Sequence, residues 1–393
     1  MAEISLFNVQ NGFVEALVRG LRSGFLTQED YRRIQQADTL EDVRSALEET
    51  DYGNFLQDEP SPIHVATIAK RCYEKLSDEF LFIKAQSNEP LTTFMDFIAR
   101  EKMIDNVITI IQCALNQKAP VEMQEKIHPM GWFESMRDIM KETFDVQGGF
   151  EEVYRIFLVD TPVGKYFQEY LETQAGDSSD ELTKFETSDV GKILNNKDLE
   201  IMKAHVKKLW LEDFYNFVTQ QGGTTAEVMG NILKVEADFR VLLVTFNSLG
   251  TDLSGDSKRH ERNSLFPTFG YLYPEGFKEL RQATNDTTVR AALEPFQQYS
   301  KLYEDVKEFY NKESNIKSPI GQSSIEDMIY KENALQYELA FEQQFHYGVI
   351  YAWVKLREQE IRNIRWISNM IVLNQKDQIE NTVVQIFEPR MGK

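Results

Sequence analysis

The stretch FEQQFHYGVIYAWVKLREQEIRNIRWISNMI, residues 341–371, decides the fold class of this chain. Its apolar side chains recur at helical spacing, at Phe341, Phe345, Val349, Ala352, Leu356, Ile364, Ile367 and Ile371. This spacing places them on one face of a helix. We therefore predict one long amphipathic helix over 341–371. Because strand-like alternation is almost absent elsewhere, the sequence predicts an all-α protein.

The chain also contains an internal repeat. LTQEDYRRIQQADTLEDVRSALE (residues 26–48) aligns without gaps with LYPEGFKELRQATNDTTVRAALE (residues 272–294). A fainter third copy matches residues 150–167 to residues 40–56 with one inserted residue. Recurrence at this scale indicates repeated helical units, although chance similarity among helices is the alternative.

Polar residues inside apolar helical runs form a second recurring element, at residues 105–108, 238–241 and 362–365. Together the two elements predict three similar helical units and a tail, over residues 8–115, 130–250, 266–373 and 374–393. Helix starts are also marked locally. Thr39 with Asp42, and Thr224 with Glu227 after two glycines, have the spacing of a capping box.

Composition narrows the class of protein. The 393 residues include 63 acidic and 43 basic side chains, which gives a formal net charge of −20. A body of this charge repels nucleic acid and anionic lipid unless a basic patch stands apart, and the sequence has none. We expect no nucleic-acid partner and no direct lipid contact.

Cysteines and targeting signals indicate the compartment. Cys72 and Cys113 form no metal-ligand spacing, which suits a reducing, cytosolic setting. The N-terminal residues show no secretory signal. The longest charge-free stretches run about a dozen residues, whereas a bilayer crossing takes ~18–20.

The search for chemistry finds no catalytic, metal or cofactor site. The five histidines are scattered, and none lies in a metal-binding motif. Residues 250–255 have the glycine spacing of a phosphate loop, but Asp256 and Ser257 follow where Lys and Ser or Thr are needed. The sequence therefore offers no residue constellation for catalysis or for a cofactor, and an enzyme with an unusual site is the alternative.

The charged stretch KLREQEIRN, residues 355–363, has three interpretations. It could be a solvated helix face with i,i+4 pairs, or a polar surface that contacts partner subunits. The third interpretation is a pair of carboxylates for acid–base chemistry. Glu358 and Glu360 disfavour it, because residues two apart on a helix point in different directions. Trp366 beside it could be a core residue or an aromatic anchor at an interface.

Several stretches resemble, in order, the d subunit family of eukaryotic V-type proton-pumping ATPases. They are NGFVEALVRGLRSGFLTQEDY (11–31), TLEDVRSALEETDYGNFL (39–56), MIDNVI (103–108), HPMG (128–131), LVDTP (158–162), GGTTAEVM (222–229), NSLGT (247–251), LFPTFGYLYPEG (265–276) and QFHYGVIYAWVKLREQEIRNIRWI (344–367). The departures lie in the polar segments 173–199, 255–263 and 297–324, and residues 388–393 look like an extension.

The resemblance implies a funnel of three similar helical domains around a pseudo-threefold axis. It implies a non-catalytic rotor subunit on the cytosolic face of vacuolar or endosomal-type membranes. Its partners would be the proteolipid c-ring and the central-stalk D and F subunits, with the a subunit as a further candidate. Contact with the membrane would pass only through these proteins. The rival interpretation is a cytosolic, all-helical scaffold or adaptor without a role in pumping.

Four residues in or near the family-like stretches are the candidates for coupling or interface contacts: Phe94, His128, Glu358 and Trp366. Phe94 precedes MIDNVI, and His128 opens the HPMG turn. Glu358 and Trp366 are eight residues apart, so on one helix they point to roughly similar sides. The alternative for Phe94 and Trp366 is a place in the core.

Overall fold

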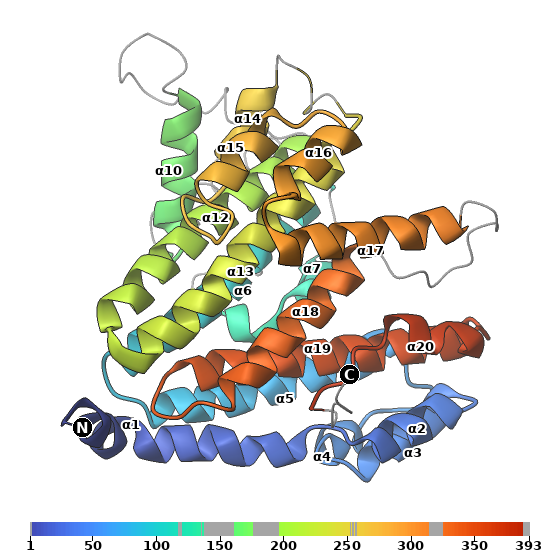
Figure 1. Ribbon diagram of the computed structural model, residues 1–393. Helices are drawn as coiled ribbons and strands as arrows, with labels where there is room; N and C mark the ends of the chain where they lie inside the picture. Colours follow the sequence, from blue (N-terminus) through green and yellow to red (C-terminus); the bar gives the residue numbers. More distant parts are fainter. Residues whose placement is uncertain are drawn as a thin grey trace. The chain divides into compact units, whose positions relative to one another are not determined.

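The computed structural model describes residues 2–116, 120–134, 136, 161–175, 196–251, 253, 255, 258–313 and 325–387. Within these ranges the chain forms α-helices and short 3₁₀ helices and no β-strand (Figure 1). The prediction of an all-α protein is confirmed. Parts of the expected third repeat copy (150–160), of the polar segment 173–199 and of the C-terminal extension (388–393) lie outside the described residues.

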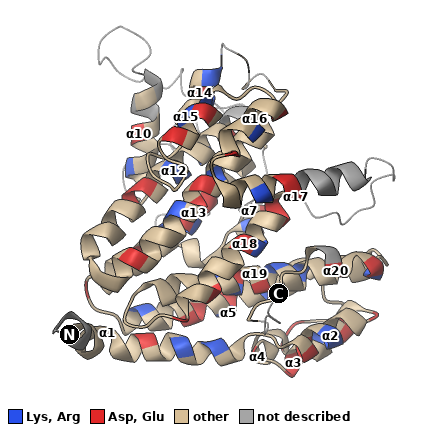
Figure 2. Ribbon diagram, in the orientation of Figure 1, with Lys and Arg blue, Asp and Glu red and all other residues tan. Residues whose placement is uncertain are grey.

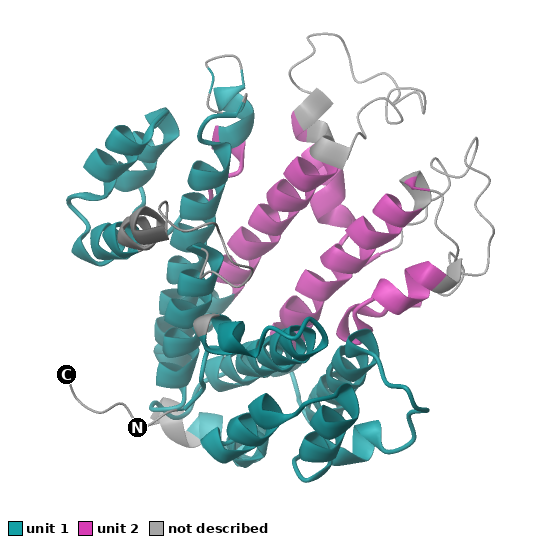
Figure 3. Ribbon diagram, turned by 90° about the vertical axis from the view of Figure 1, so that its right-hand side faces the viewer, with its two compact units in different colours: residues 1–92, 218–262, 268–393 teal, residues 93–217, 263–267 magenta. Residues whose placement is uncertain are grey.

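Contacts divide the chain into two compact units, which Figure 3 colours separately. The first unit comprises residues 1–92, 218–262 and 268–393, and the second comprises 93–217 and 263–267. This division follows contact density, whereas the predicted division into three follows sequence similarity. The three-unit organisation remains a prediction.

The first unit is built around long helices that pack against one another. α19 packs against α18 and α5, and α13 packs against α18. Its helices are α1 (Ala2–Gly20), η1 (Leu21–Gly24), α2 (Gln28–Gln36), α3 (Leu40–Glu48), α4 (Gly53–Leu56), α5 (Val65–Ala85), α13 (Gly223–Ser248), α15 (Glu275–Gln282), α16 (Asp286–Leu293), α17 (Gln297–Glu313), α18 (Ile325–Ala340), α19 (Gly348–Val372), η4 (Lys376–Gln378) and α20 (Ile379–Thr382).

The second unit has an aromatic core. It holds most of α6 (Leu91–Leu115) and α12 (Asn196–Gln221), with α7 (Pro120–Lys126), η2 (Pro129–Gly131), α10 (Gly164–Ala175) and the end of α14 (Arg259–Ser264). The rings of Phe97 and Phe214 stack with centroids 5.1 Å apart, and the Trp210 indole N–H donates to the Phe97 carbonyl at 2.8 Å. These contacts fix α12 against α6.

The two segments that align without gaps fold in the same local way. Residues 26–48 contain the N-terminal helix pair, α2 and α3, and residues 272–294 contain the C-terminal helix pair, α15 and α16. Matched apolar positions are buried in both copies: Leu26 and Leu272, Tyr31 and Phe277, Ile34 and Leu280, Val43 and Val289, Leu47 and Leu293. The repeat is thus a repeat of helix pairs with the same buried face.

The second helix of each pair starts with a capping box at aligned positions. Thr39 and Asp42 exchange hydrogen bonds at the start of α3, and Asn285 and Thr288 do so at the start of α16. Each box satisfies backbone N–H groups that have no partner inside the helix. The capping box predicted at Thr39 is confirmed.

We expect Thr39→Ala and Asn285→Ala each to lower the free energy of unfolding by about 0.5–2 kcal/mol, because each removes an N-cap acceptor. Urea unfolding followed by circular dichroism measures this. Thr287→Ala is the matched control, since Thr287 is exposed on α16 outside the box. Cap variants as stable as this control would contradict the prediction.

Two local predictions are wrong. The helix expected from Phe341 begins only at Gly348, after a turn in which Phe345 has a φ of 64°. The Glu15 carboxylate of α1 accepts the Phe345 N–H at 2.9 Å, so a tertiary contact holds this turn. At the start of α13, the N-cap is Gly222, without a side-chain cap. Thr224, the predicted cap, lies inside the helix. The hydroxyl of its neighbour Thr225 accepts the Tyr347 N–H at 3.2 Å.

Charged residues are distributed along the helices of the described chain. Figure 2 shows that acidic and basic residues alternate with other residues along α2, α3 and α13. Among the described residues, no helix combines the length and the apolar character that a membrane crossing requires.

Candidate functional site

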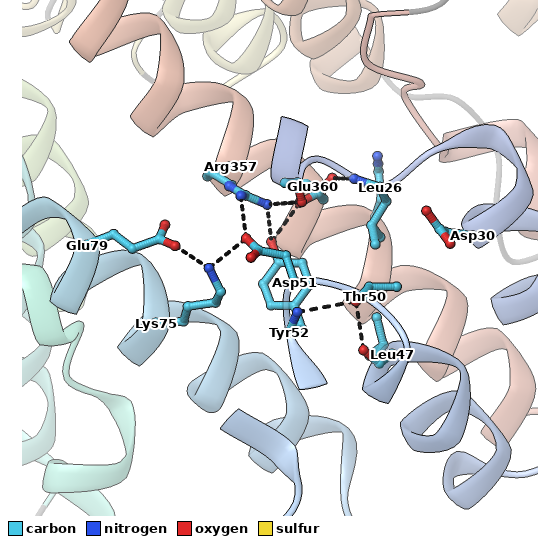
Figure 4. A network of polar contacts seen from close by, with 12 residues as sticks. Leu26, Asp30, Leu47, Thr50, Asp51, Tyr52, Lys75, Glu79, Arg357 and Glu360 are labelled. Carbon is cyan, nitrogen blue, oxygen red and sulfur yellow. Dashed lines mark hydrogen bonds and ion pairs between the residues drawn. The ribbon is translucent and has the colours of Figure 1, made fainter. Parts of the chain in front are cut away.

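A buried arginine on α19 organises a polar network in the first unit (Figure 4). The Arg357 side chain is only 2% exposed. Its guanidinium donates through Nη1 to Glu360 Oε1 and through Nη2 to Asp51 Oδ2, both at 2.8 Å. A charge removed from water in this way is tolerated only when it is paired and hydrogen-bonded. Arg357 meets both conditions.

Glu360 binds the N-terminal part of the chain directly. Its fully buried carboxylate accepts the Leu26 backbone N–H at 2.6 Å and the Tyr52 hydroxyl at 2.7 Å. Leu26 leads into α2, and Tyr52 is the N-cap of α4. One side chain of α19 therefore holds two segments that lie more than three hundred residues away in sequence.

A glycine makes room for this network. The carbonyl of Gly24 accepts from Arg357 Nη1 at 2.9 Å. A Cβ at this position would lie 2.5 Å from Asp51 Oδ2 and 2.6 Å from Arg357 Nη2. Any side chain at residue 24 would therefore push the guanidinium and the carboxylate apart.

The network continues outward through α5. Lys75 Nζ donates to Asp51 Oδ2 at 2.7 Å and also pairs with Glu79 one turn further along the same helix. Asp51 is 38% exposed, whereas Lys75 is nearly buried. Two cations and three carboxyl groups thus form a chain from the interior near Glu360 to the surface at Asp51.

The pKa shifts follow from burial and pairing. Burial raises the pKa of Tyr52, and Glu360 raises it further, so Tyr52 keeps its proton and donates to Glu360. Burial opposes the charge on Arg357, but its contacts with Tyr52 and Glu360 outweigh burial and raise its pKa. Burial also raises the pKa of Glu360, and Arg357 counteracts this. The arginine remains charged throughout the physiological range.

The arrangement is suited to bracing rather than to binding a ligand. It ties α19 to η1, α4 and α5, which come from the two ends of the sequence. Among the described ranges, no group of three or more His, Cys, Asp or Glu side chains could hold a metal ion. We refer to Asp51, Tyr52, Lys75, Arg357 and Glu360 below as the brace.

Two of the predicted site residues lie in the second unit. Phe94 is fully buried within α6, the helix that also carries MIDNVI, and its ring is 5.3 Å from that of Phe214. His128 opens η2, where its Nδ1 accepts the Met130 N–H at 3.2 Å. The Asn106 side chain binds the backbone N–H and carbonyl of His128. Phe94 has the surroundings of a core residue.

The other two predicted site residues, Glu358 and Trp366, lie on α19 in the first unit. Glu358 is partly buried and pairs with Lys355 at 3.8 Å. Trp366 is also partly buried, and its Nε1 has no hydrogen-bond partner among the described residues. The four predicted residues are therefore divided between the two units, and none belongs to the brace. Their coupling role stays a prediction.

The interpretation of residues 355–363 as a solvated face is wrong for two of its charged residues. Arg357 and Glu360 are buried, because each neutralises the other and the N-terminal segments supply further hydrogen bonds. One sequence signal could have found this. Glu360 lies midway between Leu356 and Ile364, at the position that the apolar stripe skips.

The fold and the brace define an all-helical protein whose buried charges hold distant segments together. The family model described as ATP synthase (C/AC39) subunit matches residues 14–382. A probable V-type proton ATPase subunit d of Oryza sativa is 39% identical over 386 residues, covering 98% of this chain and 99% of that protein. Those of Dictyostelium discoideum and Saccharomyces cerevisiae are 38% and 35% identical, and each alignment covers at least 96% of both chains. The chain belongs to the family of V-type proton ATPase d subunits.

Proposed function

We propose that this chain is a non-catalytic rotor subunit of a V-type proton-pumping ATPase, which couples the central stalk to the proteolipid ring. The observation that carries the proposal is the similarity to proteins named V-type proton ATPase subunit d over nearly the full length of both chains. The expected partners are the proteolipid c-ring, the central-stalk D and F subunits and the a subunit. The pseudo-threefold funnel of three helical units is part of this proposal.

A torque coupler must be stiff, and the first unit has two sources of stiffness. Its long helices are closely packed, and packed interiors deform little. The brace adds charge-assisted hydrogen bonds between α19 and the N-terminal helices, and such bonds are about twice as strong as neutral ones. Both features support transmission of torque through this chain.

We place the subunit on the cytosolic face of vacuolar or endosomal-type membranes. The net charge of −20 opposes direct binding to anionic lipid, so its membrane contact would pass through partner proteins. Purification of the tagged chain in mild detergent should recover the proteolipid ring and the D and F subunits. Recovery without the ring would instead favour the cytosolic scaffold.

Glu358 provides the test of coupling at residue level. If Glu358 is a coupling residue, we expect Glu358→Ala to leave the subunit folded and the complex assembled; its ion pair with Lys355 is long, at 3.8 Å. In that case the Glu358→Ala substitution should lower the ratio of proton pumping to ATP hydrolysis by about two- to fivefold. Both rates are measured on the same membranes.

Lys355→Ala is the matched control for the ion pair. If Glu358 acts through a partner subunit, Lys355→Ala should keep the normal ratio. A proportional loss of pumping and hydrolysis in Glu358→Ala, together with reduced assembly, would reject the coupling role.

A further inference from the structure

A second buried carboxylate, outside the brace, holds the C-terminal helix pair. Asp238 of α13 is fully buried in the first unit. Its Oδ2 accepts the Tyr271 N–H at 2.9 Å and the Tyr299 hydroxyl at 2.6 Å, and its Oδ1 accepts the Leu272 N–H at 3.1 Å. Asp238 thus fastens the loop before α15 and the first turns of α17 to one helix.

The loop lies so close to the carboxylate that residue 270 must be a glycine. Gly270 has a φ of 150°, which side chains rarely adopt, and a Cβ there would lie 2.3 Å from Asp238 Oδ1. A side chain at residue 270 would therefore force the loop away from the carboxylate.

This contact is the counterpart of the Glu360 contact in the internal repeat. Leu272 occupies the position that matches Leu26 in the gap-free alignment, and the N–H of each leucine is held by a buried carboxylate on a long helix. A tyrosine hydroxyl donates to each carboxylate, from Tyr52 in one case and Tyr299 in the other. The same device therefore fastens both helix pairs.

The two contacts differ in how charge is compensated. Glu360 has Arg357 at 2.8 Å, whereas no Lys or Arg in the described part of the chain forms an ion pair with Asp238. The titratable groups that face Asp238 are Tyr299 from α17, Tyr271 from the loop and Lys234 from α13 itself. The hydrogen-bond donors to the buried Asp238 carboxylate are therefore all neutral, and the charge of Lys234 favours its ionised form without a direct ion pair.

We propose that Asp238 is a proton-responsive latch, which holds the loop 270–272 and the C-terminal helix pair more firmly on α13 when it binds a proton. With a proton on Oδ2, the carboxyl still accepts the Leu272 N–H through Oδ1. If Oδ2 then donates to the Tyr299 oxygen, the Tyr299 hydroxyl turns its own hydrogen away from Oδ2. The latch thus loses its buried charge and keeps its contact with Leu272. The proton comes from solvent, and no other group needs to change its charge.

The sign of the effect follows from linkage. Burial raises the pKa of Asp238 to about 6, although the hydrogen bonds from Tyr299, Leu272 and Tyr271 act in the opposite direction. In an opened latch, water reaches the carboxyl and its pKa returns to the ordinary value of 3.8. The closed latch therefore binds the proton more tightly, so closure is favoured as pH falls through about 6.

Hydrogen exchange of the full chain tests this directly. The amides of Tyr271 and Leu272 are the latch donors, so their protection reports its opening. After correction for the chemical exchange rate, we expect protection at these amides to rise about tenfold between about pH 7.5 and about pH 5. Flat protection, or protection that falls on acidification, would overturn the proposal.

Variants assign the effect to Asp238. Asp238→Asn should abolish the pH dependence at these two amides, and Glu227→Gln, at an exposed position of the same helix, should preserve it. Tyr299→Phe removes a bond that favours the charged form, so it should move the midpoint to higher pH. An unchanged midpoint in both Asp238→Asn and Tyr299→Phe would assign the pH dependence elsewhere and reject the latch.

Discussion

Arg357→Ala is expected to lower the free energy of unfolding by about 3–5 kcal/mol, the usual consequence of removing one partner from a buried ion pair. The substitution leaves Glu360 fully buried without its cation at 2.8 Å. It also removes the donor to the Gly24 carbonyl and one of the two cations bound to Asp51. The contact of α19 with the N-terminal helices should weaken first.

Chemical unfolding at neutral pH measures the effect. Arg32→Ala is the matched control, because Arg32 pairs with Glu29 at the surface, where both side chains are 64% exposed. Exposed pairs contribute about 0–1 kcal/mol, so this control should remain close to the natural protein. An Arg357→Ala variant as stable as the control would show that the brace contributes little.

A double variant separates lost pairing from lost volume. In Arg357→Met with Glu360→Leu no buried charge is left unpaired, so it should be more stable than Arg357→Ala. The loss of stability in Arg357→Ala should also be smaller at acidic pH. Without Arg357, the buried carboxyl of Glu360 titrates at a raised pKa, and a proton then removes its uncompensated charge.

Features that depend on neighbouring residues could be predicted from the sequence. Periodicity gave the all-α class, because apolar spacing of three and four reflects one face of a helix. The gap-free match of 26–48 with 272–294 located two helix pairs with the same buried positions. The capping box at Thr39 was equally visible, since both of its members lie within three residues.

Features that depend on distant segments could not be predicted in this way. The turn before α19 forms because Glu15, 330 residues away, accepts the Phe345 N–H. Arg357 pairs with Asp51 across 306 residues. An i,i+3 pair such as Arg357 and Glu360 is typical of a solvated face, and only these remote partners show that it is buried. The brace was therefore missed although its α19 residues were considered.

The coupling candidates illustrate a different limit. Phe94, His128, Glu358 and Trp366 were chosen in or near family-like stretches, and such stretches contain structural and functional residues alike. The structure distinguishes a structural from a functional role only through the surroundings of each residue. Phe94 lies in an aromatic core, whereas Glu358 is only partly buried and pairs with Lys355 at 3.8 Å. Of the two, Glu358 is the better candidate for coupling.

Phe94→Ala should be nearly as damaging as Arg357→Ala, for an unrelated reason. Phe94 is fully buried, and its ring lies 5.3 Å from Phe214, which in turn stacks on Phe97. Truncation of a buried phenylalanine leaves a cavity and costs about 3–5 kcal/mol. We expect the contact between α6 and α12 to loosen and the level of subunit in cells to fall.

Two further variants decide between a core role and a coupling role for this residue. Phe82→Ala on α5 is the matched control, because Phe82 is 56% exposed and its truncation should change stability by only about 0.5 kcal/mol. Phe94→Leu keeps most of the buried volume, so a core role predicts near-normal assembly and an unchanged ratio of pumping to hydrolysis. Both activities of Phe94→Ala should then fall together with subunit level. A stable, assembled Phe94→Leu complex with a reduced ratio would instead identify the ring itself as part of the coupling machinery.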